Sequence, residues 1–331
     1  MKACVIGGGT WGSAFALHLG SNNIQTNLWI MEEDVYEQTL RYKENRVFLP
    51  GAVFPSTVSF FNQVEEALQD IDIVFIAVPS KFCRSIYKKI APLLSDKTIL
   101  VSLTKGIEED SLLRMSQVME DVFSTYFTPN IAVLSGPSFA REVAEAHPTA
   151  VVIASKDPAL SKTIQHYISN LSFRAYTSED LIGIEISGAL KNVIALASGI
   201  LEGLQFGANS MAALVTRGLA EMTRLGTRLG AKPETFAGLA GVGDLVLTCT
   251  GRLSRNRYVG YELGKGRQLE EIVSGMKMIA EGITTTLSGW QLAQKNSTGM
   301  PICEQIFHIL YKGKDPRSAL QNLMSRKLRE E

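Results

Sequence analysis

Hydrophobic positions follow two different patterns along this chain. In the first half, short runs rich in β-branched residues are apolar at nearly every position, and they alternate with segments of helical period. Continuous apolar runs are typical of strands that are covered on both faces. The alternation predicts a doubly wound parallel sheet with right-handed crossovers. The strands are expected at residues 3–6, 27–30, 71–78, 98–103, 130–134 and 150–154, with helices between them, for example at 11–19 and 80–94.

Helical patterns replace this alternation after a last strand signal at residues 173–178. Because few strand signals follow, we expect two domains, a sheet domain at 1–178 and an all-helical domain at 179–331. The helices of the second domain are expected at residues 184–204, 210–229, 233–237, 257–265, 269–274, 284–295, 301–311 and 316–326.

The charges of the chain balance. Its 331 residues include 33 basic and 33 acidic ones, so the formal net charge is zero. A neutral chain has no global field that would attract nucleic acid or an anionic membrane. No charge-free apolar run approaches the roughly 18 residues that a membrane-spanning helix needs. We expect no nucleic-acid partner and no integral membrane association, and any phosphate-bearing ligand has to be bound by local groups.

Cysteine and histidine show no metal or disulfide pattern. The four cysteines are scattered without CxxC spacing, which suits reduced thiols in a cytoplasmic enzyme. The four histidines stand alone, without an HExxH or paired-ligand pattern. We therefore predict neither a structural nor a catalytic metal.

A glycine-rich turn follows the first predicted strand. Gly7, Gly9 and Gly12 fit the G-x-G-x-x-G pattern, in which glycines allow a tight turn, close approach of a pyrophosphate and close packing of helix on strand. The helix that begins beside Thr10 and Trp11 would hold phosphates with its amides and its dipole. The alternative is a glycine-rich turn without a ligand. The position of the pattern favours a Rossmann domain that binds a dinucleotide at 1–178.

Acidic residues follow the second predicted strand. Glu32, Glu33 and Asp34 lie about 20 positions after the glycines, where a carboxylate contacts the ribose of NAD. An acidic cluster there would repel the 2′-phosphate of NADP, so NAD is the expected cofactor, with NADP possible. The alternative is that these residues only cap and charge the next helix.

Polar residues also follow two later strands, at the edge where open α/β sheets bind ligands. Lys105 follows the strand at 98–103, and Gly136 and Ser138 follow the strand at 130–134. The alternatives are that Lys105 is an exposed lysine in a turn and that the Gly-Pro pair only forms a turn.

One lysine lies on an otherwise apolar helix of the second domain. Helical spacing places Ser187, Gly188, Ala195 and Ser198 on the face of Lys191, and these small residues leave room beside its ammonium group. A lysine in such a place suits proton transfer. The alternative is that its stem packs against the helix while its head reaches water.

Two polar segments follow that helix. Asp244 lies in a glycine-rich bend and could bind a substrate hydroxyl, pair with Lys191 or cap a helix. Residues 248–257 combine hydroxyls, an amide and guanidinium groups before a helix. They could form a local phosphate site or a solvated basic loop.

Nearly from end to end, the chain resembles the NAD(P)-dependent glycerol-3-phosphate dehydrogenase family. The resemblance rests on several motifs in the right order, which together are far more specific than the glycine pattern. These motifs are GGGTWG (7–12), VPS (78–80), TKG (104–106), SGPSFA (135–140), KNVIA (191–195), FGAN (206–209), TRGLAEM (216–222), GVGDL (241–245), SRNR (254–257) and EG (281–282).

The resemblance implies a Rossmann-like doubly wound sheet, followed by an all-α domain like the C-terminal domain of 6-phosphogluconate dehydrogenase, with the active site between them. It implies reversible NAD(P)H-dependent reduction of dihydroxyacetone phosphate to sn-glycerol 3-phosphate, which supplies glycerophospholipid synthesis. A homodimer is expected, since helical second domains often form such interfaces.

Residue roles follow from the same resemblance. The lysine that matches Lys191 is the proton donor and acceptor at the substrate oxygen, and the one that matches Lys105 contacts substrate and cofactor. The other substrate-lining positions match Gly136, Ser138, Asp244, Ser254, Arg255 and Asn256, with the arginine on the phosphate. The cofactor-contacting positions match Gly7, Gly9, Thr10, Trp11, Gly12, Met31, Phe82, Lys105, Ala140, Arg255, Ile279 and Glu281.

Three points bear on cofactor and activity. Many bacterial members carry a basic residue or a histidine where this chain has Met31, and the segment 29–34 is more similar to eukaryotic NAD-dependent members, which favours NAD. Two alternatives keep the nucleotide site, namely another β-hydroxyacid or 6-phosphogluconate-type dehydrogenase and a non-catalytic NAD-binding regulator. The segment 254–257 favours a small phosphorylated substrate, and the presence of Lys105, Lys191 and Asp244 favours catalysis.

Overall fold

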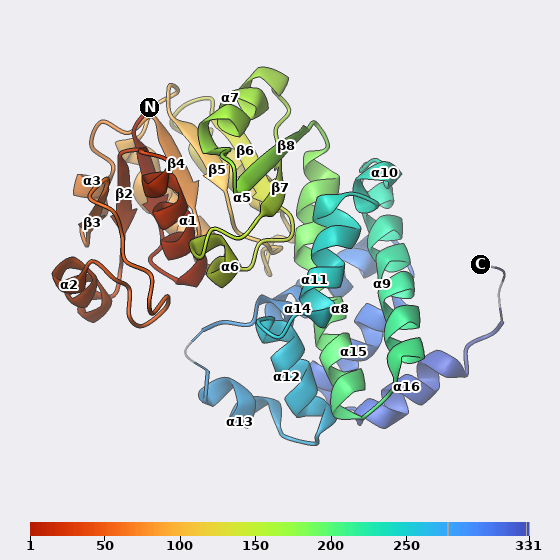
Figure 1. Ribbon diagram of the computed structural model, residues 1–331. Helices are drawn as coiled ribbons and strands as arrows, with labels where there is room; N and C mark the ends of the chain where they lie inside the picture. Colours follow the sequence, from red (N-terminus) through yellow and green to blue (C-terminus); the bar gives the residue numbers. More distant parts are fainter. Residues whose placement is uncertain (277, 329, 331) are drawn as a thin grey trace. The chain divides into compact units, whose positions relative to one another are not determined.

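The structure is a computed structural model that describes residues 1–276, 278–328 and 330. The chain divides into two compact units (Figure 1). The first unit comprises Met1–Lys105 and Leu113–Ile184, and the second comprises Gly106–Leu112 and Glu185–Glu331. The short segment Gly106–Leu112 thus groups with the second unit, although it follows a strand of the first.

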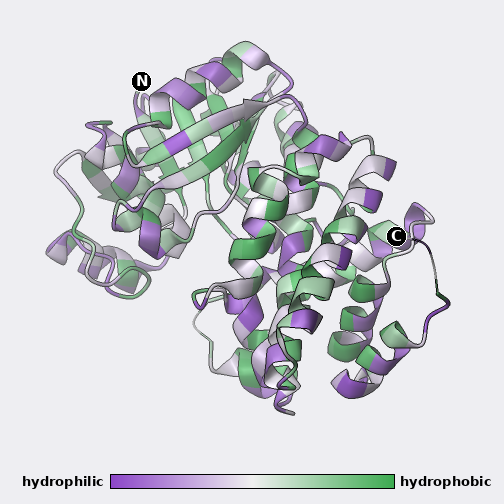
Figure 2. Ribbon diagram, turned by 45° about the vertical axis from the view of Figure 1, so that its right-hand side comes forward, coloured by the Kyte–Doolittle hydropathy of each residue, from purple (hydrophilic) through white to green (hydrophobic). Residues whose placement is uncertain are grey.

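The described residues of the first unit form an eight-stranded sheet of order β3-β2-β1-β4-β5-β6-β7-β8. The predicted strands are all present, and β3 is a strand that the sequence patterns missed. Figure 2 shows the strands as mostly hydrophobic ribbons. The strands are β1 (Ala3–Ile6), β2 (Thr26–Trp29), β3 (Val58–Phe61), β4 (Ile73–Ile76), β5 (Ile99–Ser102), β6 (Asn130–Ser135), β7 (Thr149–Ala154) and β8 (Phe173–Ser178).

Helices cover both faces of this sheet. Alternate residues of β1 belong to different cores: Val5 packs in the same cluster as Phe15 and Phe75, whereas Ile6 packs in the cluster of Tyr87. This explains why the strands are apolar at successive positions. The helices are α1 (Thr10–Ser21), α2 (Glu33–Tyr42), α3 (Val64–Ala67), α4 (Ser80–Ile90), η1 (Ala91–Leu93), α5 (Met115–Phe123), α6 (Ala140–Ala144) and α7 (Pro158–Ile168).

The sheet is parallel as predicted, except at one pair of strands. β7 runs antiparallel to β6, and β8 is parallel to β7, so the last two strands are reversed relative to the others. After β6 the chain turns back at the same edge of the sheet instead of crossing to the other edge.

The second unit is helical, as predicted, and the described residues after Ser178 contain no strand. Two elements at the glycine-rich bend, η2 and α11, were not anticipated. The helices are α8 (Leu181–Gly203), α9 (Ala208–Arg228), α10 (Pro233–Phe236), the π-helix η2 (Leu239–Gly243), α11 (Asp244–Thr250), α12 (Arg255–Gly264), α13 (Leu269–Ser274), α14 (Glu281–Lys295), α15 (Pro301–Lys312) and α16 (Pro316–Met324).

Helix α8 is the centre of this unit. A Cβ atom at Gly199 would lie 1.9 Å from the carbonyl oxygen of Arg257, and one at Gly260 would lie 2.0 Å from that of Leu196. Glycine at both positions therefore lets the backbones of α8 and α12 touch. By length and composition α8 could cross a membrane, but 94% of its most apolar window is buried inside the protein. Its apolar surface is already covered by other helices.

A buried carboxyl group joins α9 to the start of α15. The two side-chain oxygens of Glu221 accept the amide hydrogens of Ile302 and Cys303, at 2.7 and 3.2 Å. Burial raises the pKa of this carboxyl to about 7, although the two amides and the charges of Arg224 and Arg326 act to lower it. The folded protein thus prefers the protonated form at mildly acidic pH.

This gives a testable dependence of stability on pH. Because the folded pKa of Glu221 lies above its ordinary value, its stabilising contribution is complete below about pH 4.5 and is lost as the pH rises through 7. The full difference is about 3 kcal/mol. Glu221→Gln should remove this dependence on pH. The wild type should therefore lose stability relative to the variant as the pH rises from 5 to 8.

Urea unfolding at a series of pH values measures this difference. The comparison with the variant is needed because His18 acts in the opposite direction: burial lowers its pKa, so its contribution is lost as the pH falls. A stability difference that stays constant with pH would show that Glu221 does not titrate in this range.

Candidate functional site

The carboxyl ends of neighbouring parallel strands carry the predicted nucleotide-site residues of the first unit. Ile6, Ile76 and Ser102 lie at the same register level at the ends of β1, β4 and β5. The chain passes from β1 to β2 and β3 on one side of β1 and then returns to form β4 on the other side. The edge between β1 and β4 is therefore a topological switch point, where open α/β sheets bind ligands.

The glycine-rich turn has the geometry that the sequence pattern predicted. Gly7 has φ of 116°, which a side chain would strain. A Cβ atom at Gly12 would lie 1.9 Å from the carbonyl oxygen of Gly7, so only glycine allows this contact of helix and strand. At Gly9, by contrast, a Cβ atom would meet no described atom within 4 Å. Gly9 therefore borders open space at the N-terminus of α1, beside Thr10 and Trp11.

A buried asparagine that sequence reasoning missed stabilises this turn. The side-chain amide of Asn45 donates to the carbonyl oxygen of Gly8 at 2.7 Å and to the hydroxyl of Ser13 at 2.9 Å. That hydroxyl in turn donates to the Gly8 oxygen at 3.1 Å. Asn45 lies in a stretch without regular structure, so no local pattern could have identified it.

The segment after β2 presents its side chains to solvent. Met31 is 58% exposed. Glu32 is at the N-cap of α2 without a side-chain capping bond, and Glu33 and Asp34 form the first turn of the helix. The alternative that they charge the helix N-terminus thus holds for Glu33 and Asp34, and their exposure leaves contact with a ribose open as well.

Lys105, Gly136 and Ser138 come together in the first unit. The ammonium group of Lys105 donates to the carbonyl oxygen of Gly136 at 2.9 Å, and the hydroxyl of Ser138 donates to the same oxygen at 3.0 Å. Lys105 is thus not only an exposed turn lysine. Of the two other predicted positions in this unit, Phe82 is an exposed ring near the start of α4, and Ala140 begins α6.

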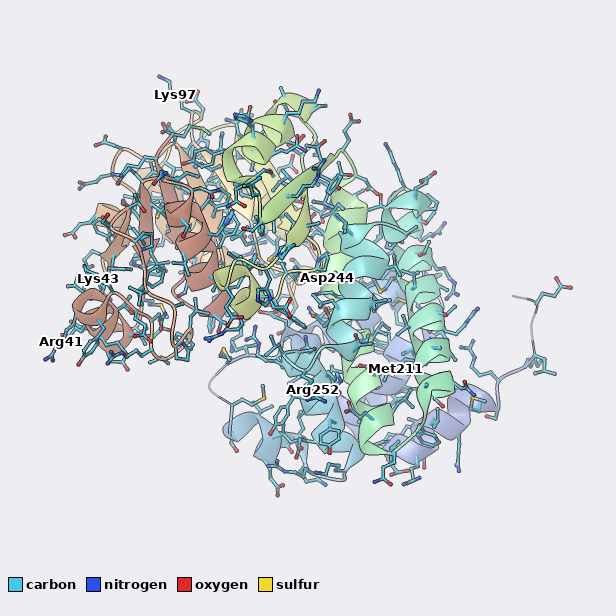
Figure 3. All side chains as sticks on the ribbon, in the orientation of Figure 1. Arg41, Lys43, Lys97, Met211, Asp244 and Arg252 are labelled. Carbon is cyan, nitrogen blue, oxygen red and sulfur yellow. The ribbon has the colours of Figure 1, made fainter. Side chains whose placement is uncertain are left out.

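The second unit contains a buried ion pair. Lys191 donates to a carboxylate oxygen of Asp244 at 2.6 Å and to the hydroxyl of Thr248 at 2.9 Å. The side chains of Lys191 and Asp244 are only 8% and 1% exposed. Asp244 begins α11 within the helical unit (Figure 3). Of the three roles open for Asp244, the structure shows the pairing with Lys191, and the N-cap position of α11 belongs to Gly243.

Thr248, which the sequence analysis named only as part of the possible phosphate segment 248–257, is a partner of Lys191. Its hydroxyl donates to the backbone oxygen of Asp244 at 2.6 Å while it accepts from Lys191. The spacing of four residues from Asp244 on one helix was an available signal. Asp244 and Thr248 together hold the ammonium group of Lys191 in one position.

Two side chains of the segment 254–257 form hydrogen bonds that stabilise the helical unit. The hydroxyl of Ser254 caps α12 by accepting from the amide of Arg257 at 3.2 Å. The side chain of Asn256 donates to that of Asn192 and accepts from the amide of Gly282, both at 2.9 Å. Asn256 therefore joins α12 to α8 and α14 through both of its polar atoms.

Three predicted cofactor positions of the second unit are neighbours. Arg255 donates to the backbone oxygen of Ile279 at 2.9 Å. Surrounding protein lowers the pKa of the Arg255 guanidinium group, and the charge of Glu281 partly opposes this. Because only one of its nitrogens is used in this bond, Arg255 keeps further N–H donors for an anion.

Cys249 and Cys303 are buried thiols of the second unit. Burial raises the pKa of the Cys249 thiol to about 12, and it raises that of Cys303 further. Such thiols do not form the nucleophilic thiolate near neutral pH. Nowhere in the described part of the chain do three histidine, cysteine or carboxylate side chains gather to hold a metal ion.

Two family descriptions match this chain in succession. The NAD-dependent glycerol-3-phosphate dehydrogenase N-terminus matches residues 2–161, and the corresponding C-terminus matches residues 180–321. The chain belongs to the NAD-dependent glycerol-3-phosphate dehydrogenase family. Members of this family are oxidoreductases, and the match covers both units.

Named relatives agree over the whole length. A glycerol-3-phosphate dehydrogenase [NAD(P)+] of Koribacter versatilis is 49% identical over 327 residues, which are 98% of this chain and 97% of that protein. One of Bacillus velezensis is 44% identical over 98% of this chain and 94% of its own. The crystal structure of glycerol-3-phosphate dehydrogenase from Coxiella burnetii has a TM-score of 0.95 at 38% identity, covering 98% and 99% of the two chains.

Proposed function

We propose that this protein reduces dihydroxyacetone phosphate to sn-glycerol 3-phosphate with a reduced nicotinamide dinucleotide, in a reversible reaction. The observation that carries the proposal is the buried pair of Lys191 and Asp244, because a lysine fixed in this way supplies a proton at a defined point. Family membership gives the substrate class, and the glycine-rich turn gives the cofactor class.

The residues of the first unit fit a dinucleotide. The open space at Gly9, the free approach to the N-terminus of α1 and the switch-point edge of the sheet are the features that a pyrophosphate needs. When bound, the nicotinamide supplies the hydride. Gly7, Gly9, Thr10, Trp11 and Gly12 would hold the pyrophosphate end. Met31, Phe82, Ala140, Arg255, Ile279 and Glu281 are the other proposed contacts.

Lys191 donates the proton in the proposed reduction. The alkoxide that forms when hydride reaches the carbonyl carbon takes a proton from its ammonium group, and in the reverse direction the neutral amine takes it back. Asp244 and Thr248 orient the ammonium group by accepting its hydrogen bonds. Lys105, which the Gly136 oxygen holds, polarises the carbonyl group with its positive charge.

The substrate phosphate needs local cations, because the chain as a whole is neutral. Arg255 supplies guanidinium donors at the start of α12, where backbone amides also favour an anion. The other proposed substrate contacts are Ser254, Asn256, Gly136 and Ser138.

Further parts of the proposal are a cytoplasmic location, a homodimer and a role in supplying the glycerol phosphate backbone of phospholipids.

Steady-state kinetics test the activity. Oxidation of NADH should depend on dihydroxyacetone phosphate, and a panel of β-ketoacids and 6-phosphogluconate, assayed in the appropriate directions, should support far lower kcat/KM. Preference for one of these other compounds would replace the proposed substrate, and NADH binding without turnover on any of them would favour a regulator.

Cofactor preference is a separate prediction. With Met31 and three acidic residues after β2 and no basic side chain among them, kcat/KM should be higher with NADH than with NADPH. Met31→Arg should raise kcat/KM for NADPH by about tenfold, which corresponds to roughly 1.4 kcal/mol for one charge-assisted contact. Assays with both cofactors side by side measure this ratio. An unchanged ratio in the variant would show that position 31 does not face the adenosine ribose.

A further inference from the structure

A large cavity within the second unit takes no part in the proposed reaction. Its volume is about 770 Å³, which lies in the range of pockets that hold small organic ligands. Four helices line it, and each contributes residues at helical spacing from one face. These lining residues include Ala197, Ile200, Leu201 and Leu204 of α8, Leu214 of α9, Ile302, Ile306 and Ile309 of α15, and Ala319, Leu320 and Leu323 of α16.

Cationic side chains gather around this apolar cavity. Arg217 and Arg224 of α9 and Arg326 and Lys327 after α16 are among its lining residues, and all four are exposed. Among the described residues that line the cavity, Glu221 is the one acidic side chain. Both oxygens of Glu221 are already held by backbone amides of α15. The cavity thus has apolar walls, and the charged side chains that line it are mostly cationic.

Two of these four cations lie close to Glu221. Arg224 and Arg326 both interact with Glu221, so they lie on the side of the cavity where α15 begins. Arg224 also donates to the backbone oxygen of Gly299, which precedes that helix. The residues of α8 and α16 give the remaining walls their apolar character. A ligand that fits this distribution has one long apolar part and one anionic end.

We propose that this cavity binds a free long-chain fatty acid, with its chain between α8, α9, α15 and α16 and its carboxylate among Arg217, Arg224, Arg326 and Lys327. Burial of a methylene chain supplies affinity, and the cations select a charged end over a neutral one. The proposal goes beyond the dehydrogenase reaction and does not depend on it, because the reaction uses none of these lining residues.

A second copy of this chain is the alternative occupant. In a two-fold dimer one self-complementary surface is used, so a projection of each copy can enter a hollow of the other. The excess of positive charge around the cavity favours an anionic ligand over a second copy, and the sedimentation experiment below separates the two.

The decisive experiment is titration of the full-length protein with laurate by isothermal calorimetry. Saturable binding of one laurate per chain is expected, with at least tenfold weaker binding of 1-dodecanol and no measurable binding of butyrate. Absence of saturable laurate binding, or equal binding of laurate and 1-dodecanol, would overturn the proposal.

Neighbouring alanines of α9 offer a matched pair of variants. Ala213 lines the cavity, whereas Ala212 does not, and both are exposed, so neither substitution disturbs the core. Ala213→Phe should fill the cavity and weaken laurate binding at least tenfold, and Ala212→Phe should bind as the wild type does. Equal binding by both variants would place laurate elsewhere.

Charge is tested in the same way. Lys327→Glu should weaken laurate binding about threefold to tenfold, as reversal of one exposed charge near an anion does. Lys97→Glu, on the first unit (Figure 3), is the control and should have no effect.

Sedimentation of the wild type and of Ala213→Phe completes the test: a dimer that this substitution dissociates would show that a second copy covers the cavity. NADH-dependent turnover, measured separately, reports on the proposed function alone.

Discussion

Replacing Lys191 by alanine is expected to lower turnover by about 10²- to 10⁴-fold, which is the usual contribution of a positioned general acid. NADH binding should remain close to that of the wild type, because the glycine-rich turn lies in the other unit. Stopped-flow or steady-state assays measure turnover, and quenching of protein fluorescence measures NADH binding. Near-normal turnover in this variant would remove Lys191 from the proposed role.

A double variant separates chemistry from stability. Lys191→Ala leaves the Asp244 carboxylate, 1% exposed, without its cation, and breaking a buried pair in this way costs about 3–5 kcal/mol. Lys191→Met combined with Asp244→Leu removes both charges, so most of the lost stability should return, as apolar replacement of a whole buried pair often allows. Turnover should stay low. Recovery of turnover together with stability would mean that the single substitution acted only through folding.

Replacing Gly12 by alanine should destabilise the first unit by about 3 kcal/mol or more and abolish NADH binding. The added Cβ atom would lie 1.9 Å from the Gly7 carbonyl oxygen. That contact is with backbone, so no flexible side chain can move to relieve it, and overpacking of this kind commonly costs about 1–3 kcal/mol even where relief is possible. Urea unfolding measures stability, and fluorescence titration measures NADH binding.

Gly9→Ala is the matched control at the same turn. Its Cβ atom would meet no described atom within 4 Å, so the variant should fold as stably as the wild type. Its affinity for NADH should nevertheless fall about tenfold or more, because the methyl group enters the space that a pyrophosphate needs. If Gly9→Ala bound NADH normally, the phosphates would have to lie elsewhere.

The sequence predicted the regular elements well where the hydrophobic pattern was continuous. The predicted strands and the long helices of the second unit are confirmed, and so is the mostly parallel sheet. It missed β3 because only alternate residues of this strand are buried, so its apolar pattern is not continuous. It also missed α11, since the glycines before Asp244 indicate a bend rather than a helix. The direction of β7 was wrong, because strand direction depends on how the connection closes in space.

Local sequence determined the glycine-rich turn, the apolar strands and the helix that carries Lys191, since these depend on residues close together along the chain. Only tertiary structure decided that Asn45 holds Gly8, that Lys191 pairs with Asp244, and that Glu221 binds the start of α15. These pairs are separated by 37, 53 and 81 residues. Periodicity describes which face of an element is buried, but it contains no information on which distant polar group meets it there. That choice follows from the packing of whole elements, which leaves each buried donor or acceptor only the partners within its reach.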